Sequence, residues 1–436
     1  MDRISVHVWL PGQAEPTLAG EFWRDGQVGR FLYASDYLAA QLPALAPDLP
    51  LRPKPQAITG GHAIFPLFLD AGPDSWGRHV LERKLERSVT ELEALSLCPT
   101  DGVGNIALGA LTDDRLRVLK LEEFLDILHE LEAGGHARDT LEEQVLDAHG
   151  NGTSMGGTKP KLTIERNGAL YLAKFPANGD SPWLPHAECA TLKLAHQCQL
   201  RTIVDPEVWR LPSGRSALLV RRFDREQVVN GYARRGYVSA HSLLRLDTLP
   251  QSANDHLLFG TKGFTEHSLR KSYVALADHM ARWCGSQATQ REERRELWRR
   301  IVFNALVRNL DDHTHNHGLL CEDMARQHWR LSPAFDLVPA ASLPKDPALC
   351  LAYRFVRGGR GATATPARLL RVINPADLLA AAVEHYAWAE LEAKDYLQFA
   401  AAIVTQNWRD AFRQEGMAEK EIERFGSCFE FARTLA

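Results

Sequence analysis

Alternation of apolar and polar residues at the start of the chain predicts a small antiparallel sheet. Residues 4–10 alternate in this way, and residues 18–23 and 28–34 have the pattern of two further strands. The pair Asp25–Gly26 lies between those two strands and is a strong hairpin signal, because both residue types accept the backbone angles of a tight turn. We therefore expect the chain to begin with a β-rich subdomain.

Apolar residues at helical spacing become the main pattern further along the chain. Asp74 or Ser75 can cap a helix that continues through Leu85, because a side-chain oxygen there accepts from the first backbone N–H groups. The periodicity predicts further helices over residues 121–131, 186–199, 291–306, 389–413 and 418–436. Buried strands are predicted at residues 161–165, 169–175 and 217–220.

The helix ending near Leu306 leads directly into a polar segment, Asn309–His313, which is followed by the apolar pair Leu319–Leu320. A polar segment between packed elements is a loop, and loops held in this way often carry function. We therefore expect this loop to contain functional residues.

The spacing inside this loop is that of a kinase catalytic loop. Asn316 follows Asp311 by five positions, and Asp336 lies twenty positions further on. In kinases the Asp accepts the proton of the attacking hydroxyl, the Asn binds magnesium, and a later Asp is the second metal ligand. The interval alone often arises by chance, and Asp312 could cap a helix instead.

Two other functions are compatible with parts of this segment. His313, His315 and His317 alternate, so a strand there would place three imidazoles on one face, near Asp311, as in a zinc- or manganese-dependent hydrolase. Alternatively, the protein could be a catalytically inactive co-repressor. The presence of Asp311, Asn316, Asp336 and Lys174 argues against an inactive co-repressor.

Composition and charge narrow the class of protein. The chain has 436 residues, of which 45% are apolar and 24% charged, which is enough for two or three soluble globular domains. Its start has no signal-peptide pattern and no apolar run reaches membrane-span length, so we expect a cytoplasmic protein without membrane contact. The net charge of −4 indicates no direct nucleic-acid binding, and the seven scattered cysteines indicate reduced thiols.

Further kinase-like features occur in order before the loop. The glycine-rich segment His149–Pro160 could bring backbone N–H groups close to phosphates. Lys174 ends an apolar strand, and Glu188 on the next predicted helix could pair with it. The strand over residues 217–220 ends at Arg222–Phe223, where we expect a hinge whose backbone meets adenine. Taken alone, the glycine-rich segment could be an ordinary flexible loop and Glu188 an ordinary solvated glutamate. The occurrence of all these features in kinase order favours a kinase.

The chain resembles the HipA-type serine/threonine kinases, the toxins of bacterial type II toxin–antitoxin pairs, nearly from end to end. The matching segments are Val8–Gly12, Pro73–Arg78, Ser154–Lys161, Ala173–Pro176, Arg222–Arg225, Phe303–Leu306, Asn309–Asn316 and Leu331–Asp336. The resemblance implies an α+β, two-lobed protein-kinase-like fold with an N-terminal antiparallel β subdomain and a helical C-terminal lobe. We expect residues 1–115 to form that β subdomain, 116–225 the small-lobe region and 226–436 the large lobe.

The resemblance also implies roles for individual residues. Asp311 would be the catalytic base, and Asn316 and Asp336 would hold magnesium. The residues expected to contact ATP are Ser154, Met155, Gly156, Gly157, Thr158, Lys174, Glu188, Arg222, Phe223, Asp224 and His313. Ser154 would also be an autophosphorylation site that silences the kinase, because its phosphate would repel those of ATP. Thr153 and Thr158 are the alternative positions for that modification.

Partners are implied by the resemblance as well. Family members phosphorylate a cytoplasmic protein, in known cases an aminoacyl-tRNA synthetase, and thereby arrest growth. Many pair with a small helix-turn-helix antitoxin of the HipB type. We expect this acidic chain to meet DNA only through such a partner.

Overall fold

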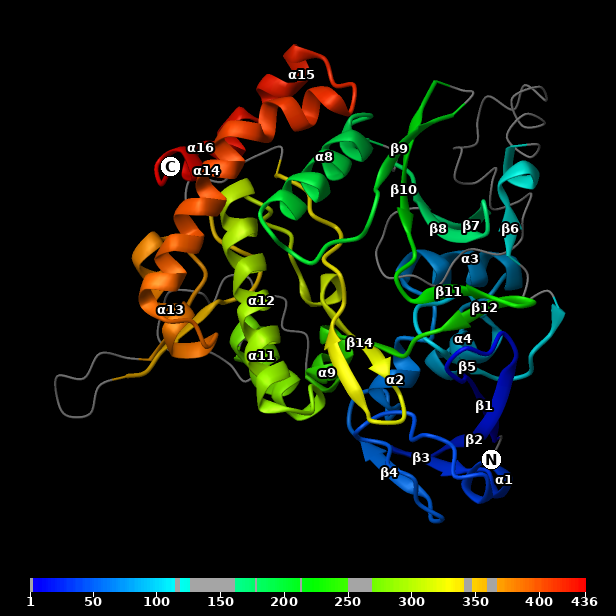
Figure 1. Ribbon diagram of the computed structural model, residues 1–436. Helices are drawn as coiled ribbons and strands as arrows, with labels where there is room; N and C mark the ends of the chain where they lie inside the picture. Colours follow the sequence, from blue (N-terminus) through cyan, green and yellow to red (C-terminus); the bar gives the residue numbers. More distant parts are fainter. Residues whose placement is uncertain are drawn as a thin grey trace. The chain divides into compact units, whose positions relative to one another are not determined.

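The computed structural model describes residues 3–113, 118–125, 161–176, 179–211, 214–249, 269–340, 347–358 and 367–436 (Figure 1). The chain forms two compact units. Unit 1 comprises Met1–Pro185, Ile203–Val238 and Leu320–His328. Unit 2 comprises His186–Thr202, Ser239–Leu319 and Trp329–Ala436. The division into three parts at residues 115 and 225 stays a prediction.

Unit 1 begins with a five-stranded antiparallel sheet. Its strands, in spatial order, are β4 (Gln56–Thr59), β3 (Val28–Tyr33), β2 (Pro16–Asp25), β1 (Ile4–Trp9) and β5 (Ile106–Leu108). The β2–β3 hairpin turns where predicted, and Gly26 has a φ of 61°, which glycine adopts without a Cβ clash. The predicted N-terminal sheet is confirmed.

Aromatic rings fill the core beside this sheet. Phe22 and Phe31 meet Phe68 edge-on, with ring centroids 5.8 and 5.3 Å apart. Phe68 comes from α2, and the helices around the sheet are α1 (Ser35–Ala39), α2 (Pro66–Leu69), α3 (Ser75–Leu85) and α4 (Glu91–Leu97). The sheet therefore packs against helices that lie in sequence between its strands β3 and β5.

Helix α3 begins where predicted, and its cap also holds a buried ion pair. Asp74 Oδ1 accepts from the Gly77 backbone N–H over 2.6 Å. Its Oδ2 lies 2.8 Å from Lys161 Nζ, with both side chains almost fully buried. Because either charge alone would be costly to bury, the pair links α3 to the start of the next sheet.

A second five-stranded sheet in unit 1 carries Lys174. Its spatial order is β6 (Leu119–Lys120), β7 (Lys161–Arg166), β8 (Ala169–Lys174), β10 (Ser216–Arg221) and β9 (Glu207–Arg210). β6 pairs with β7 in parallel, and the other neighbours are antiparallel. Leu162, Ala173 and Leu219 lie in its core, which confirms the three strands predicted in this region.

Smaller β elements complete the strand inventory of the described residues. They are the hairpin β11 (Arg225–Val228) and β12 (Gly231–Arg234), the three-stranded sheet β13 (Tyr237–Ser239), β14 (Gly318–Asp323) and β15 (His328–Leu331), and the hairpin β16 (Arg354–Val356) and β17 (Arg368–Leu370).

Unit 2 is mainly helical. Its longer elements are α8 (Leu184–Gln197), α11 (Tyr273–Trp283), α12 (Gln287–Val307), α13 (Pro375–His385) and α14 (Glu390–Gln414), and its short ones are α9 (Ala240–Leu243), η1 (Leu246–Thr248) and η2 (Thr314–Asn316). Helix α12 packs against α11, α13 and α14 (Figure 1). Trp298 of α12 is fully buried, and its Nε1 donates to the Leu378 carbonyl over 3.0 Å.

The prediction of one continuous helix over residues 418–436 is wrong. The chain there forms α15 (Glu419–Arg424), η3 (Gly426–Phe429) and α16 (Glu430–Arg433). The break allows Phe429 to stack on Trp408, with ring centroids 4.3 Å apart and planes 17° from parallel. This buried stacking favours the break over a straight helix.

The remaining fold predictions can be compared with the described residues. Residues 121–125 are helical, and the rest of the helix predicted over 121–131 lies outside them. Among the described helices, none has the length and apolar character needed to cross a membrane. The prediction of an α+β fold with an N-terminal antiparallel sheet and a helical C-terminal region is confirmed.

Candidate active site

The end of α12 delivers the loop that the sequence singled out. Arg308 ends the helix in the left-handed conformation, with a φ of 52°, and its N–H remains bonded to the helix. The Asn309 N–H then donates to the Asn304 carbonyl over 2.9 Å. This tight ending turns the chain away from the helix axis, so the following residues form a loop on a rigid base.

The loop closes on itself between Asp311 and Asn316. The main-chain oxygen of Asp311 accepts from the His313 N–H over 2.8 Å and from Asn316 Nδ2 over 3.3 Å. Asn316 is the last residue of η2 and is 6% exposed, whereas Asp311 is exposed. The structure therefore brings together these two predicted site residues and leaves the Asp311 side chain accessible to a reactant.

Asp311 and Asp312 are adjacent in sequence but have opposite environments. Asp312 is 1% exposed, and its Oδ2 accepts from Asn304 Nδ2 over 2.5 Å and from the Tyr273 hydroxyl. His317 Nε2 lies 2.8 Å from the same oxygen. A general base must be able to reach the substrate hydroxyl. The Asp311 carboxylate is exposed and meets this requirement, whereas that of Asp312 is buried.

Asp336 adopts a backbone conformation that is uncommon for an aspartate. Its φ is 58°, in the left-handed region, where residues other than glycine carry strain. The segment before it is held by the Ala334 N–H, which donates to the Arg201 carbonyl over 2.7 Å. This bond fixes the backbone two residues before Asp336.

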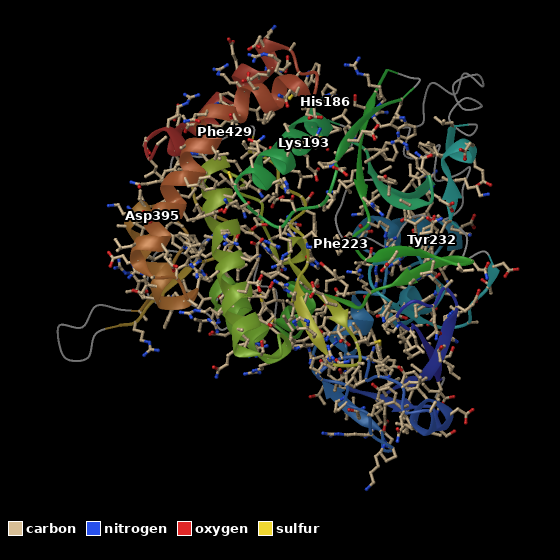
Figure 2. All side chains as sticks on the ribbon, viewed as in Figure 1. His186, Lys193, Phe223, Tyr232, Asp395 and Phe429 are labelled. Carbon is tan, nitrogen blue, oxygen red and sulfur yellow. The ribbon has the colours of Figure 1, made fainter. Side chains whose placement is uncertain are left out.

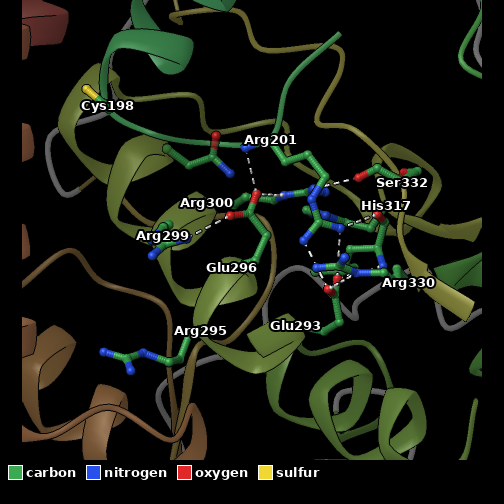
Figure 3. A network of polar contacts seen from close by, with 12 residues as sticks. Cys198, Arg201, Glu293, Arg295, Glu296, Arg299, Arg300, His317, Arg330 and Ser332 are labelled. Carbon is green, nitrogen blue, oxygen red and sulfur yellow. Dashed lines mark hydrogen bonds and ion pairs between the residues drawn. The ribbon is translucent and has the colours of Figure 1, made fainter. Parts of the chain in front are cut away.

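A network of charged side chains around the buried Glu293 holds the chain that leads to Asp336, and Figure 3 shows this network. Glu293 of α12 is fully buried and accepts from Arg201 Nη2 over 2.9 Å, from Arg330 Nε over 2.7 Å and from the Leu331 N–H over 2.8 Å. Burial by itself would raise the pKa of Glu293, but the two guanidinium groups outweigh it and hold that pKa below its usual value.

A second glutamate of α12 extends this network. Glu296 Oε1 accepts from the Arg201 N–H over 3.0 Å and from Arg300 Nε over 3.2 Å. Arg300 in turn donates to the Ser332 carbonyl over 2.5 Å. Helix α12 therefore holds Arg201, in the chain after α8, and Ser332, in the chain leading to Asp336.

The prediction that a strand would align three imidazoles is wrong. Residues 314–316 form the 3-10 turn η2, because the Asn316 N–H donates to the His313 carbonyl. His317 is buried against Asp312, while the His315 ring stacks on His241 with centroids 4.1 Å apart. Within the described residues, no group of three or more His, Cys, Asp or Glu side chains is arranged to hold a metal ion.

Lys174 and Glu188, expected to pair, fall in different units. Lys174 ends β8 in unit 1, opposite Lys161 on one neighbouring strand and Leu218 on the other. Glu188 is buried on α8 in unit 2. Their pairing stays a prediction. Ser154, Met155, Gly156, Gly157 and Thr158, and the alternative Thr153, lie outside the described residues.

Helix α8 is anchored at Glu415, just after the end of α14. Lys193 Nζ lies 2.6 Å from one Glu415 carboxylate oxygen, and the Cys189 thiol donates to the other over 3.2 Å. His186 Nδ1 lies 2.6 Å from the Glu415 carbonyl, so its imidazole N–H donates there. Figure 2 shows His186 and Lys193 on this helix. These contacts fix the helix that carries Glu188.

Arg222 and Asp224 have a structural role that the sequence did not indicate. The fully buried Asp224 carboxylate lies 2.8 Å from Arg222 Nη2 and 2.5 Å from Arg225 Nη1. Arg222 also donates to the Asp101 and Gly102 carbonyls over 2.5 and 2.9 Å. Both side chains are thus engaged in holding the turn after α4, which contains Asp101, Gly102 and Gly104.

Phe223 and His313, unlike the buried Arg222 and Asp224, are partly exposed. The Phe223 ring contacts Tyr237 with centroids 6.0 Å apart, and the His313 ring contacts His315 edge-on at 5.8 Å. Their predicted contacts with a nucleotide stay predictions.

Tyr273 and Asn304 are the site residues that sequence reasoning missed. Tyr273 contacts Asp312 from a helix 39 positions earlier, which no local spacing could have indicated. Asn304 lies eight positions before Asp312, near the end of α12. The available signals were Asp312 itself, a second carboxylate beside the predicted base, and the matching segment Phe303–Leu306, which contains Asn304.

Comparison with known proteins finds two family models that match this chain. A family model described as "HipA-like C-terminal domain" matches residues 153–408, and one described as "HipA N-terminal domain" matches residues 6–109. Comparison with curated protein sequences finds no match.

Two solved structures are similar to the chain. One is from the Shewanella oneidensis MR-1 toxin–antitoxin system and is a complex of HipA, HipB and operator DNA. Its matching chain superposes with a TM-score of 0.66 and is 17% identical in sequence. The match covers 98% of this chain and 95% of that chain. The other is the Helicobacter pylori proinflammatory kinase CtkA, with a TM-score of 0.42 and 14% identity, over 64% of this chain and 89% of that one. The first likeness shows a shared fold.

Proposed function

This chain belongs to the HipA-like family of serine/threonine kinases, and we propose that it transfers the γ-phosphoryl group of ATP to a hydroxyl of a protein substrate. The observation that carries the proposal is the Asp311–Asn316 loop. Its exposed carboxylate and its tied asparagine are the two side-chain types that a kinase catalytic loop uses, which supports the proposal.

Asp311 acts as the base in this proposal. Its exposed carboxylate accepts the proton of the substrate hydroxyl as that oxygen attacks the γ-phosphorus and the bond to the ADP oxygen breaks. Asp312 cannot take this role, because three donors surround one of its oxygens and the side chain is buried.

The donor set of unit 2 fits magnesium. Asn316 and Asp336 offer an amide oxygen and a carboxylate, which are the hard ligands that magnesium prefers. The Asn316 nitrogen donates to Asp311, so the oxygen of the same amide is the atom available to a metal. Magnesium, when bound, offsets the negative charge of the phosphates.

Unit 1 supplies nucleotide-binding residues in this proposal. Lys174 pairs with phosphate oxygens, Phe223 and the backbone beside it bind the base, and the glycine-rich segment with Ser154 covers the phosphates. Glu188 and His313 complete the set of residues assigned to the nucleotide in this proposal. The buried side chains of Arg222 and Asp224 support this region without meeting the nucleotide.

The proposal extends to regulation and partners, for which the family resemblance is the support. We propose that phosphorylation of Ser154 silences the enzyme, because the added charge of about −1.5 to −2 repels ATP. The substrate is a cytoplasmic protein, of which an aminoacyl-tRNA synthetase is the type we would test first. A small HipB-type antitoxin carries the complex to DNA, an assembly supported by the composition of the Shewanella complex.

The test is incubation of the purified protein with labelled ATP and magnesium, followed by mapping of the label. Asp311→Asn should reduce transfer by at least about a hundredfold, because a base typically contributes about 10²–10⁴. Asp395→Asn is the matched control, an exposed aspartate on α14 labelled in Figure 2, and should retain full transfer. Full activity in Asp311→Asn would refute the assignment, and tightly bound zinc without transfer would favour the hydrolase alternative.

A further inference from the structure

The Asp312 side chain joins three separate elements of unit 2 at one oxygen. Tyr273 is the first residue of α11, Asn304 belongs to the last turns of α12, and His317 follows η2. All four side chains are at most 2% exposed. A buried carboxylate accepting from three donors is fully constrained in direction, since moving it would leave several buried polar groups unsatisfied.

The two loop positions of this cluster flank the residues of the proposed chemistry. Asp312 follows Asp311 directly, and His317 follows Asn316 directly. The hydrogen bonds within the loop set its internal shape, but they do not orient it against the helices. The Asn309 N–H anchors the start of the loop to α12, and the contacts of Asp312 with Tyr273 and Asn304 orient the part that carries Asp311.

We propose that Asp312, Tyr273, Asn304 and His317 form a buried clamp that positions Asp311 and Asn316 for phosphoryl transfer. The inference rests on the proposed function and adds positioning residues to it. Removing one member should loosen the loop by a fraction of an ångström while the fold persists. Positioning of reacting groups contributes strongly to rate, so turnover should fall more than stability.

The chemistry of the partners supports a positioning role. No guanidinium or ammonium group is among the three donors to Asp312; they are a phenol, an amide and an imidazole. Burial and the nearby Asp312 raise the pKa of Tyr273 well above its usual value, so the phenol remains a donor. An apolar cluster would pack the same space at lower desolvation cost, but it would not direct the loop.

The experiment compares two tyrosine variants with equal chemical change. Tyr273→Phe removes one donor of the clamp. Tyr386→Phe is the matched control, because Tyr386 is also fully buried in unit 2 and its hydroxyl donates to the Tyr353 carbonyl over 2.8 Å. ADP formation is measured with a generic acceptor protein over a range of ATP and magnesium concentrations, together with the melting temperature.

The clamp predicts a fall in kcat of about tenfold for Tyr273→Phe, the effect of one hydrogen bond on a barrier, with KM for ATP changed less than twofold. Tyr386→Phe should shift the melting temperature by a similar amount and keep the wild-type kcat. Asp312→Asn, which places an amide before three donors, should lose more turnover than Tyr273→Phe. If Asp312→Asn does not fold, the comparison of Tyr273→Phe with Tyr386→Phe still tests the clamp.

Failure of the clamp and failure of the proposed function give different results. If wild-type turnover depends on Asp311 but Tyr273→Phe matches Tyr386→Phe in kcat, the clamp is refuted and the kinase assignment stands. If neither the wild type nor any variant forms ADP, the proposed function fails and the clamp fails with it.

Discussion

The side-chain amide of Asn316 donates a hydrogen bond to the main-chain oxygen of Asp311, with 3.3 Å between nitrogen and oxygen. Two residues that the sequence relates only by spacing are therefore tied directly to each other. The bond also orients the Asn316 amide, so its oxygen faces away from the Asp311 carbonyl and is suited to a metal.

Asn316→Asp tests this bond, because it retains an oxygen ligand and removes the donor. The new carboxylate would face the Asp311 carbonyl oxygen, so we expect the loop to open and kcat to fall about tenfold or more. Asn407→Asp is the control, since Asn407 is a partly exposed asparagine on α14 that donates to Gln197 over 3.1 Å. Equal turnover in both variants would show that the Asn316 bond has no role.

Glu293→Gln tests the network that supports the approach to Asp336. At pH 7 the neutral amide would leave Arg201 and Arg330 without their buried carboxylate, so the free energy of unfolding should fall by about 2 kcal/mol. Glu292→Gln is the control, because Glu292 also pairs with Arg330 but is 60% exposed. Its effect should stay within about 0.5 kcal/mol.

The stability difference between the wild type and Glu293→Gln should depend on pH. The pKa of Glu293 is below its usual value, so its charged form stabilises the fold above the unfolded-state pKa of about 4.3. This contribution is lost as the pH falls through that value toward the folded-state pKa. The stability difference between wild type and Glu293→Gln should therefore shrink in urea unfolding at pH 4 relative to pH 7. A constant difference would contradict it.

Asp224→Asn separates a structural from a nucleotide-binding role. Burial would raise the pKa of Asp224, but Arg222 and Arg225 outweigh it and keep the carboxylate charged. The amide would leave two buried guanidinium groups unbalanced, so we expect a loss of about 3–5 kcal/mol in unfolding free energy. Asp25→Asn, at an exposed residue of β2, should change it by less than about 0.5 kcal/mol. A raised KM for ATP without a loss of stability would instead favour a nucleotide contact.

Local patterns predicted most of the secondary structure because they depend on neighbours in sequence. The Asp25–Gly26 hairpin, the Asp74 cap and the strand ending at Lys174 all follow from turn chemistry and periodicity. The three-imidazole strand failed, because alternation of histidines was a weaker determinant than the hydrogen bonds that close η2. The final helix failed because stacking between Trp408 and Phe429 is a tertiary contact.

By itself, the sequence determined the family and the order of the proposed catalytic parts, since Asp311, Asn316 and Asp336 are related by fixed intervals along one chain. The tertiary structure alone decided which of two adjacent carboxylates is exposed and which is buried. That choice depends on Tyr273, Asn304 and His317, which reach Asp312 from three elements. Burial and hydrogen bonding are properties of residues brought together by folding, and no spacing of residues in sequence specifies them.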